Sequence, residues 1–212
     1  MIKSIIFDVG GVLMADVPLK KIAQELSMRF SMPEDELHSY LYPNEHWTLL
    51  TLGKISENEY WEYFLKTSKV NVDKEELKDV VRTELRPIEE TVKILPLLKR
   101  QCQLAILSNH SKEWSEFMTK EYYFFSYFDQ IIFSCEVGLR KPDSRIYKLA
   151  LTKLGSMPEE CLFIDDKKRN TDGAEEVGMK TITLDNISNL REELFQFGIA
   201  LGGINHANKR KS

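Results

Sequence analysis

The chain has 212 residues, of which 42% are hydrophobic and 29% charged, the balance of an ordinary globular protein with a sizeable core. The net charge of -4 at pH 7 excludes a broad basic surface, so we expect no nucleic-acid partner. The longest apolar runs fall well short of the roughly 20 residues that cross a bilayer, so we expect no membrane partner either. Three widely spaced cysteines and the lack of a signal-peptide pattern predict a soluble cytoplasmic protein.

The chain opens with an apolar run at residues 2–8 that is typical of a buried β-strand. Asp8 ends this run, and Gly10 and Gly11 follow it, so a carboxylate stands where the backbone turns sharply. The carboxyl end of a strand in an open α/β sheet is a favoured place for chemistry. Asp8 is therefore the first candidate functional residue.

Residues 15–88 contain helical patterns and no convincing strand. The patterns cover residues 18–30, 33–41, 57–66 and 73–85. Ser31 and Ser56 stand three residues before Glu34 and Glu59, the spacing of a capping box at a helix start. The segment is predicted to be a helical insertion after the first strand.

From residue 89 onward, short apolar runs alternate with helical patterns. The predicted strands cover residues 104–107, 131–133, 162–164 and 181–184. Continuous apolar strands between helices predict an α/β fold whose mostly parallel sheet is covered on both faces. We therefore predict a core formed by residues 1–14 and 89–212, a helical insertion at 15–88, and a frayed basic tail at 206–212.

Polar residues follow the predicted strands at four places. They are Asp8, Ser108-Asn109, Lys141 and Asp165-Asp166. The carboxyl ends of parallel strands share one edge of the sheet, so these side chains can converge. Carboxylates, a hydroxyl and a lysine suit a phosphate group held beside Mg²⁺, which prefers carboxylate and phosphate oxygens.

The order of these motifs resembles that of the haloacid dehalogenase superfamily. The matching segments are Phe7-Asp8-Val9-Gly10-Gly11-Val12-Leu13, Leu107-Ser108-Asn109, Gly138-Leu139-Arg140-Lys141-Pro142 and Phe163-Ile164-Asp165-Asp166. They extend over nearly the whole chain, and four motifs in the right order are far more specific than one. The resemblance implies a Rossmann-like core with an all-helical cap at 15–88, and it is greatest for small phosphatases of sugar phosphates and related metabolites.

The resemblance also implies roles for the residues that handle the phosphate group. Asp8 matches the nucleophile, which attacks phosphorus and forms an aspartyl phosphate. Ser108 and Asn109 match the substrate-binding cradle for the phosphate, together with nearby backbone amides. Lys141 matches the catalytic and substrate-binding cation that neutralises the transferring group.

The metal site follows from the same resemblance, with Mg²⁺ as the implied cofactor. Asp8 and Asp166 match direct ligands, and Asp165 matches a direct or water-mediated one. The remaining protein ligand is a backbone carbonyl two residues after the nucleophile, which here belongs to Gly10.

Gly10 departs from the family pattern, which usually has a second Asp at this position. In family phosphatases that Asp protonates the leaving alcohol and then activates water. General acid–base help contributes about 10²–10⁴-fold, so we expect a preference for good leaving groups such as aryl or anomeric phosphates. His46 or His110 could substitute as the acid.

Substrate selection is assigned to the predicted cap. Trp47 and His46 lie in a loop-like stretch beside Pro43 and Asn44, and they are the candidate specificity residues. The expected substrate is a small phosphorylated metabolite, with sugar phosphates among the candidates, and the expected state is a monomer or homodimer.

Two other functions remain open from the sequence. A haloacid dehalogenase would use Asp8 to attack carbon without a metal, but such a site gains nothing from Asp165 and Asp166. A catalytically silent ligand- or protein-binding module is favoured by Gly10, but the other motifs are intact. The Mg²⁺-dependent phosphatase is the function that the sequence favours.

Overall fold

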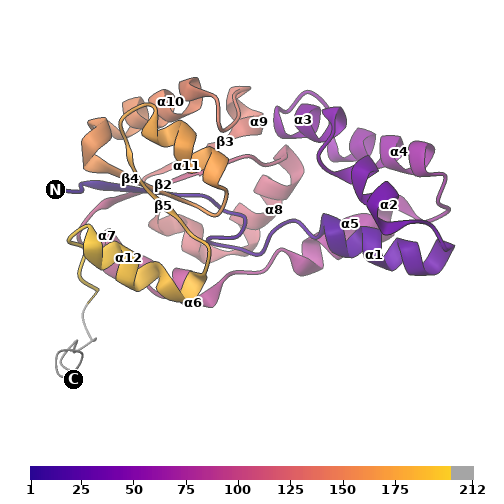
Figure 1. The fold of residues 1–212 in the computed structure, drawn as a ribbon, viewed down its shortest axis with the longest axis horizontal. Helices are drawn as coiled ribbons and strands as arrows, with labels where there is room; N and C mark the ends of the chain where they lie inside the picture. Colours follow the sequence, from indigo (N-terminus) through magenta and orange to yellow (C-terminus); the bar gives the residue numbers. More distant parts are fainter. Residues whose placement is uncertain (202–212) are drawn as a thin grey trace.

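A computed structural model describes residues 1–201 of the chain (Figure 1). Its centre is a sheet of five parallel strands in the spatial order β3-β2-β1-β4-β5. The strands are β1 (Ser4–Phe7), β2 (Gln103–Ser108), β3 (Gln130–Phe133), β4 (Cys161–Asp165) and β5 (Lys180–Thr183). The predicted α/β, Rossmann-like fold is confirmed.

Helices cover both faces of this sheet, which is why its strands are apolar on both sides. α10 (Ser144–Leu154) and α11 (Lys168–Glu175) lie on one face, and α7 (Leu95–Lys99) and α12 (Leu190–Gln196) lie on the other (Figure 1). The other elements of the core are α6 (Glu89–Val92), α8 (Lys112–Glu121), η1 (Tyr123–Tyr127), α9 (Ser134–Val137), η2 (Pro158–Glu160) and η3 (Ile187–Asn189).

β1 lies at the centre of the sheet, between β2 and β4. The register pairs Phe7 with Ile106 of β2 and with Ile164 of β4. Asp8 comes directly after Phe7, and Asp165 comes directly after Ile164. These two acids are therefore neighbours at the carboxyl edge of the sheet. This edge is the crevice where open α/β sheets bind ligands, because the strand order reverses there.

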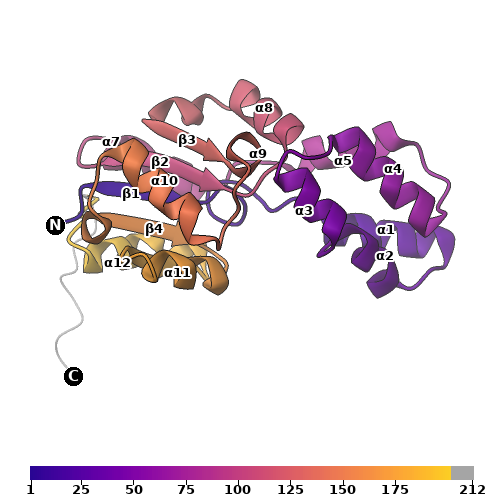
Figure 2. The same cartoon turned by 90° about the horizontal axis from the view of Figure 1, so that it is seen from above.

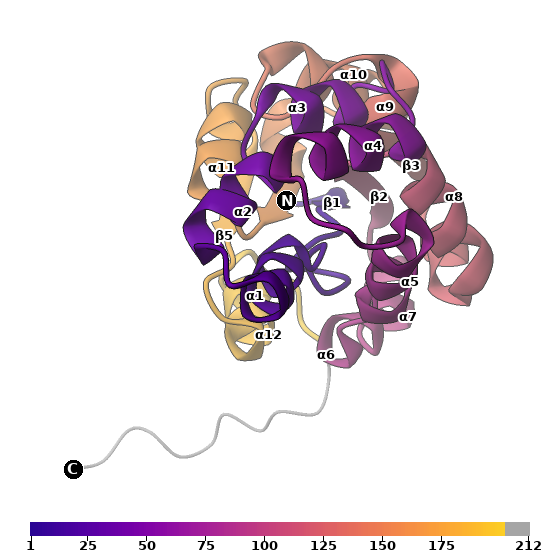
Figure 3. The ribbon, with the colours of Figure 1, turned by 90° about the vertical axis from the view of Figure 1, so that its right-hand side faces the viewer.

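A separate group of helices, here called the cap, lies beyond the carboxyl ends of the strands (Figure 2, Figure 3). The cap comprises α1 (Leu19–Phe30), α2 (Glu34–Leu41), α3 (Glu45–Thr51), α4 (Glu57–Ser68) and α5 (Lys74–Glu84). Tyr60, Trp61 and Phe64 of α4 are fully buried within it. These rings belong to the same buried cluster as one face of the sheet, and Tyr60 contacts Trp114 of α8, so aromatic packing joins the cap to the core.

Two short connections join the cap to the sheet, and they run side by side. The Ala15 N–H donates to the Arg86 carbonyl (2.9 Å), and the Ile88 N–H donates to the Leu13 carbonyl (2.8 Å). These bonds motivate our proposal that the cap extends from residue 15 to 88 and the core from 1 to 14 and from 89 onward.

Two local expectations are wrong and one is confirmed. The stretch around His46 and Trp47 is helix α3, not a loop, because the Asn44 side chain accepts the Trp47 N–H (2.8 Å) and caps the helix. Ser31 does not cap α2, which begins after Pro33 with no side-chain cap. Ser56 forms the predicted capping box with Glu59.

Among residues 1–201, no helix combines the length and the apolar character needed to cross a membrane. The predicted basic tail at 206–212 lies outside the described residues.

Candidate active site

Asp8 follows β1 directly and is almost fully buried at the carboxyl edge. Its N–H donates to the Ile164 carbonyl (2.9 Å), and its Oδ1 accepts the Val9 N–H (2.7 Å) and lies 2.9 Å from Lys141 Nζ. Burial raises the pKa of Asp8 to about 7, although Lys141 opposes this. The carboxylate is held in one orientation, and added positive charge would favour its ionised form.

Both the side chain and the backbone of Lys141 are held by neighbouring residues. Its Nζ is 2.9 Å from Asp8 Oδ1 and 2.5 Å from Asp165 Oδ2, and its side chain is 1% exposed. The Asn109 side chain accepts the Lys141 N–H (2.9 Å) and donates to its carbonyl (3.0 Å). Burial alone would lower the pKa of Lys141, but the two carboxylates raise it above its ordinary value, so the lysine stays charged.

Asp165 is fully buried, and protein donors saturate both of its oxygens. Oδ1 accepts the Lys167 N–H (2.8 Å) and Asn170 Nδ2 (2.9 Å), while Oδ2 accepts Lys141 Nζ (2.5 Å) and Asn170 Nδ2 (3.0 Å). Such a carboxylate is suited to orient Lys141. Because both of its oxygens already accept hydrogen bonds, Asp165 would contact a metal ion through water rather than directly.

Unlike Asp165, Asp166 has one carboxylate oxygen that is buried and makes no hydrogen bond within residues 1–201. Its Oδ2 lies 2.5 Å from Lys167 Nζ, whereas its Oδ1 makes no hydrogen bond in residues 1–201. Burial raises the pKa of this carboxyl group. An unpaired buried carboxylate oxygen is costly unless a cation neutralises it.

The acids of this edge can converge on one metal ion. Carboxylate oxygens of Asp8, Asp165 and Asp166 lie within 4.8 Å of one another. Gly11 allows the close approach, since its φ is 71° and a Cβ there would lie 2.7 Å from Asp166. The residues therefore fit a small oxygen-ligated cation such as Mg²⁺.

Gly10 leaves a space that another residue fills. A Cβ built on Gly10 would lie only 2.7 Å from Asp16 Oδ1, so the Asp16 carboxylate stands where a longer side chain at position 10 would extend. Lys167 Nζ, 3.3 Å from Asp16 Oδ2, links this carboxylate to Asp166. Asp16 is thus a second acid beside the loop that follows Asp8.

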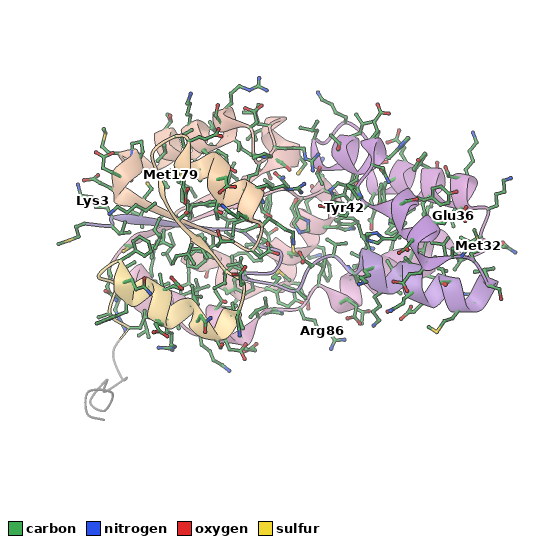
Figure 4. The ribbon with its side chains drawn as sticks, viewed as in Figure 1. Lys3, Met32, Glu36, Tyr42, Arg86 and Met179 are labelled. Atoms are coloured by element: carbon green, nitrogen blue, oxygen red, sulfur yellow. The ribbon has the colours of Figure 1, made fainter. Side chains whose placement is uncertain are left out.

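A cavity of about 250 Å³ opens between the cap and the core. Of the residues that the sequence singles out, those lining it are Asp8, Gly10, Trp47, Ser108, Asn109, His110 and Asp166. Lys141 and Asp165 do not line it; Lys141 forms ion pairs with both Asp8 and Asp165. Figure 4 shows Tyr42, a further lining residue, at the border between cap and core.

The two candidate histidines differ in position. His46 does not line the cavity, and its ring stacks on that of Tyr63, with 3.4 Å between the ring centres. His110 lines the cavity but is 3% exposed and lies edge-on to Trp114 and Phe133. Burial and, secondly, Lys141 lower the pKa of His110 to about 4, so its ring is neutral near pH 7.

Sequence reasoning missed several lining residues. They are Asp16, Val17, Leu19, Lys20, His38, Tyr42, Arg140, Lys167, Arg169 and Asn170. Arg140 lies within one of the matching motifs and Lys167 directly follows another, and these positions were usable signals. Nothing in the local sequence indicates Asp16 or Arg169, because folding alone places them at the cavity.

Comparisons with known proteins agree with this architecture. The family model described as haloacid dehalogenase-like hydrolase matches residues 5–184. The chain is 26% identical over 196 residues to flavin mononucleotide hydrolase 1 of Arabidopsis thaliana, covering 92% of this chain and 77% of that protein. It is 25% identical over 206 residues to D-ribitol-5-phosphate phosphatase of Bacteroides thetaiotaomicron, covering 92% and 97%.

The fold also matches a solved structure of a family enzyme from Bacteroides thetaiotaomicron in complex with magnesium and inorganic phosphate. The TM-score is 0.70 at 21% identity, and the match covers 86% of this chain and 94% of that one. A family model that extends over most of the chain, together with the shared fold, establishes the relationship. This protein belongs to the haloacid dehalogenase-like hydrolases.

Proposed function

We propose that this hydrolase is a Mg²⁺-dependent phosphatase that removes the phosphate from a small phosphorylated metabolite through an aspartyl phosphate on Asp8. The observation that carries the proposal is the unpartnered buried oxygen of Asp166 beside Asp8 and Lys141. A cation would neutralise the unpaired carboxylate oxygen of Asp166, and the charge of Lys141 would oppose that of a bound phosphate.

The first step breaks the ester bond. An Asp8 oxygen attacks phosphorus, the P–O bond to the alcohol breaks, and Lys141 with the Ser108 hydroxyl and the Asn109 loop holds the phosphoryl oxygens. In the second step water attacks the same phosphorus, which frees inorganic phosphate and restores the Asp8 carboxylate.

Asp8, Asp166 and the Gly10 carbonyl would hold the Mg²⁺, and Asp165 would reach it through water. When bound, the ion neutralises charge on the phosphate and keeps Asp8 ionised. Asp165 itself orients Lys141 through the short contact described above.

Asp16 is the group that we assign to proton transfer. Its carboxylate stands directly beside the nucleophile loop, lines the cavity and is not needed as a metal ligand. It would give a proton to the leaving alcohol and take one from the attacking water. His46 is turned away from the cavity and His110 is a neutral, buried ring, so both are weaker candidates.

The size of the cavity favours a small substrate. Its volume of about 250 Å³ lies below the usual range for drug-sized ligands. Trp47 is the cap residue that we propose to contact the carbon skeleton. We expect the enzyme to act in the cytoplasm, as a monomer or homodimer, on metabolites of sugar-phosphate size.

A metal-independent dehalogenase is the second candidate, and the Asp166 oxygen argues against it because carbon attack requires no cation. A silent binding module is the third, and the intact Asp8–Lys141–Asp165 ion-pair chain argues against it. Metal dependence and dependence on Asp8 distinguish these three functions in an assay.

The test is a panel of phosphate esters assayed with Mg²⁺ and with a chelator, beside the variant Asp8→Asn. The proposal expects release of phosphate that needs both Mg²⁺ and Asp8, with a loss of at least about 10³-fold in the variant. Turnover that survives the chelator contradicts the metal-dependent mechanism. No turnover of any ester favours the binding module.

A further inference from the structure

Two arginines of the core reach into the cavity on the side of the cap. Arg140 stands directly before Lys141, and Arg169 belongs to α11. Both guanidinium groups donate to neutral hydroxyls of the cap. Arg140 Nη1 is 2.8 Å from Thr48 Oγ1, and Arg169 Nη2 is 3.1 Å from the Tyr42 hydroxyl.

No carboxylate compensates these two charges within residues 1–201, where every ion pair involves other side chains. Arg140 is half-buried, and its Nε is buried without an acceptor. Burial and, secondly, repulsion by Arg169 lower the pKa of Arg140, so the two guanidinium groups lie close enough to disfavour each other's charge.

Each acid that lines the same cavity has a lysine beside it, although Asp166 Oδ1 makes no hydrogen bond within residues 1–201. Asp8 is paired with Lys141, and Lys167 lies between Asp16 and Asp166. Lys20 and His38 add further basic groups to the lining. The cap side of the cavity therefore carries excess positive charge and free guanidinium donors.

Guanidinium groups are the preferred partners of carboxylate and phosphate, because their planar N–H donors bind two oxygens at once. We propose that Arg140 and Arg169 form a second anion subsite, so that the substrate is a phosphate monoester bearing another anionic group, a carboxylate or a second phosphate, away from the transferred phosphate. This inference rests on the proposed function, since it places the transferred phosphate at Asp8.

Tyr42 and Trp47 complete the subsite. Their rings meet edge to face with 5.3 Å between centres, and both line the cavity. They supply an apolar wall for a short carbon skeleton between the two anionic ends. A competing role for the arginines is to hold the cap against the core through Thr48 and Tyr42, and the test must separate the two roles.

The test measures binding, so it does not depend on turnover. Asp8→Asn protein with saturating Mg²⁺ is titrated calorimetrically with glycerol 3-phosphate, 3-phosphoglycerate and propane-1,3-diyl bisphosphate. These three-carbon esters end in a hydroxyl, a carboxylate and a phosphate. The same titrations follow with Arg140→Gln and with Arg169→Gln added; Arg169 is exposed, so its variant threatens folding least.

The subsite predicts that 3-phosphoglycerate or propane-1,3-diyl bisphosphate, which carry an anionic group at each end, binds about tenfold or more tightly than glycerol 3-phosphate. A charge-assisted hydrogen bond contributes at least that much. Each arginine variant should abolish that advantage while leaving glycerol 3-phosphate within about twofold. The better of the two ligands identifies carboxylate or phosphate as the second group.

Arg145→Gln is the matched control, because Arg145 is exposed, pairs with Asp143 and does not line the cavity. It should leave all affinities unchanged. Equal affinities across the series, absence of binding by all three, or an equal loss for all three in the arginine variants would overturn the subsite; the last result would assign the arginines to holding the cap. Failure of the proposed function would appear separately, as lack of turnover by the protein with Asp8 intact.

Discussion

Gly10 and Asp16 share a space beside the loop that follows Asp8, which one longer side chain at position 10 could fill alone. The Cβ that Gly10 lacks would crowd Asp16 Oδ1 at 2.7 Å, so the two positions depend on each other. Residue 10 taken alone suggests a missing proton carrier. The pair suggests instead that a carboxylate reaches the same place from residue 16.

The first prediction concerns this pair. Asp16→Ala should lower turnover of alkyl phosphates by about 10²-fold, because their alkoxides need a proton to leave. Aryl phosphates should lose far less, since their leaving groups depart without one. In the double variant Gly10→Asp, Asp16→Ala the new side chain has room, and alkyl turnover should largely return.

Asp79→Ala, an exposed acid on α5, is the control and should change neither activity. Alkyl phosphate turnover that is unchanged in Asp16→Ala would show that the proton travels by another route.

The second prediction concerns His110, whose pKa is lowered by burial to about 4 from an ordinary value of 6.5. A depressed histidine pKa means that the unfolded chain binds more protons between these values, so folding stability is lost as pH falls below about 6.5. From pH 7.5 to 5 this loss should be about 2 kcal/mol.

Urea unfolding of the protein and of His110→Gln at both pH values isolates this loss, because contributions of other groups cancel in the difference. The variant should lose about 2 kcal/mol less than the parent protein. An identical pH dependence in the two proteins would show that His110 is not held neutral by the fold.

At the scale of elements, two helix starts show when a local sequence motif is enough to predict a helix cap and when it is not. Ser56 and Glu59 form a capping box because both partners lie within four residues and need nothing else. Ser31 has the same spacing to Glu34, yet it adopts a left-handed conformation (φ 52°) at the end of α1. Ser31 is the C-cap residue of the preceding helix α1, and the local motif does not reveal this role.

α4 of the cap and α8 of the core are joined by a buried acid, Glu57. Its Oε1 accepts the Trp114 indole N–H (2.7 Å), its Oε2 pairs with Arg82 (2.9 Å), and its N–H donates to Glu113 (3.1 Å). Only 3% of the Glu57 side chain is exposed. The bond to Trp114 crosses from one group of helices to the other.

The third prediction follows from this contact. Glu57→Ala should lower the free energy of unfolding by about 2–4 kcal/mol, because it leaves a buried indole N–H and a partly buried Arg82 unpaired. Glu62→Ala is the control on the same helix, where an exposed pair with Lys74 contributes under about 1 kcal/mol. Equal effects in urea unfolding would mean that Glu57 does not link the cap to the core.

At the scale of the whole molecule, metal binding and folding are coupled. The carboxylates that could hold Mg²⁺ lie directly after β1 and at the end of β4, far apart in the sequence, so the unfolded chain has no comparable site. A ligand that binds only the folded state stabilises it, by about 2.7 kcal/mol at 100 times its Kd.

The fourth prediction is that Mg²⁺ raises Tm by several degrees in the protein and much less in Asp166→Asn. Without Mg²⁺ the variant should be at least as stable as the parent, because it removes an unpaired buried carboxylate. Asp172→Asn, an exposed acid of α11, should keep the full response. A full Mg²⁺ response in Asp166→Asn would exclude Asp166 as a ligand.

The sequence by itself determined the sheet and most helices, and it predicted the motif residues Asp8, Ser108, Lys141 and Asp166, three of which line the cavity. These follow from apolar periodicity and from motifs that act over a few residues, which the chain carries in its local order. The sequence did not reveal the helix at residues 45–51, since a short helix with one cap has little periodicity.

Only the tertiary structure decided how the cavity is completed. Asp16, Arg140 and Arg169 reach it because the cap connections and α11 bring distant segments to one edge of the sheet. Side-chain convergence of this kind depends on packing between elements, and residue types in sequence order do not encode it. The sequence alone singled out Asp8, but it did not single out Asp16 or Arg169, which line the same cavity.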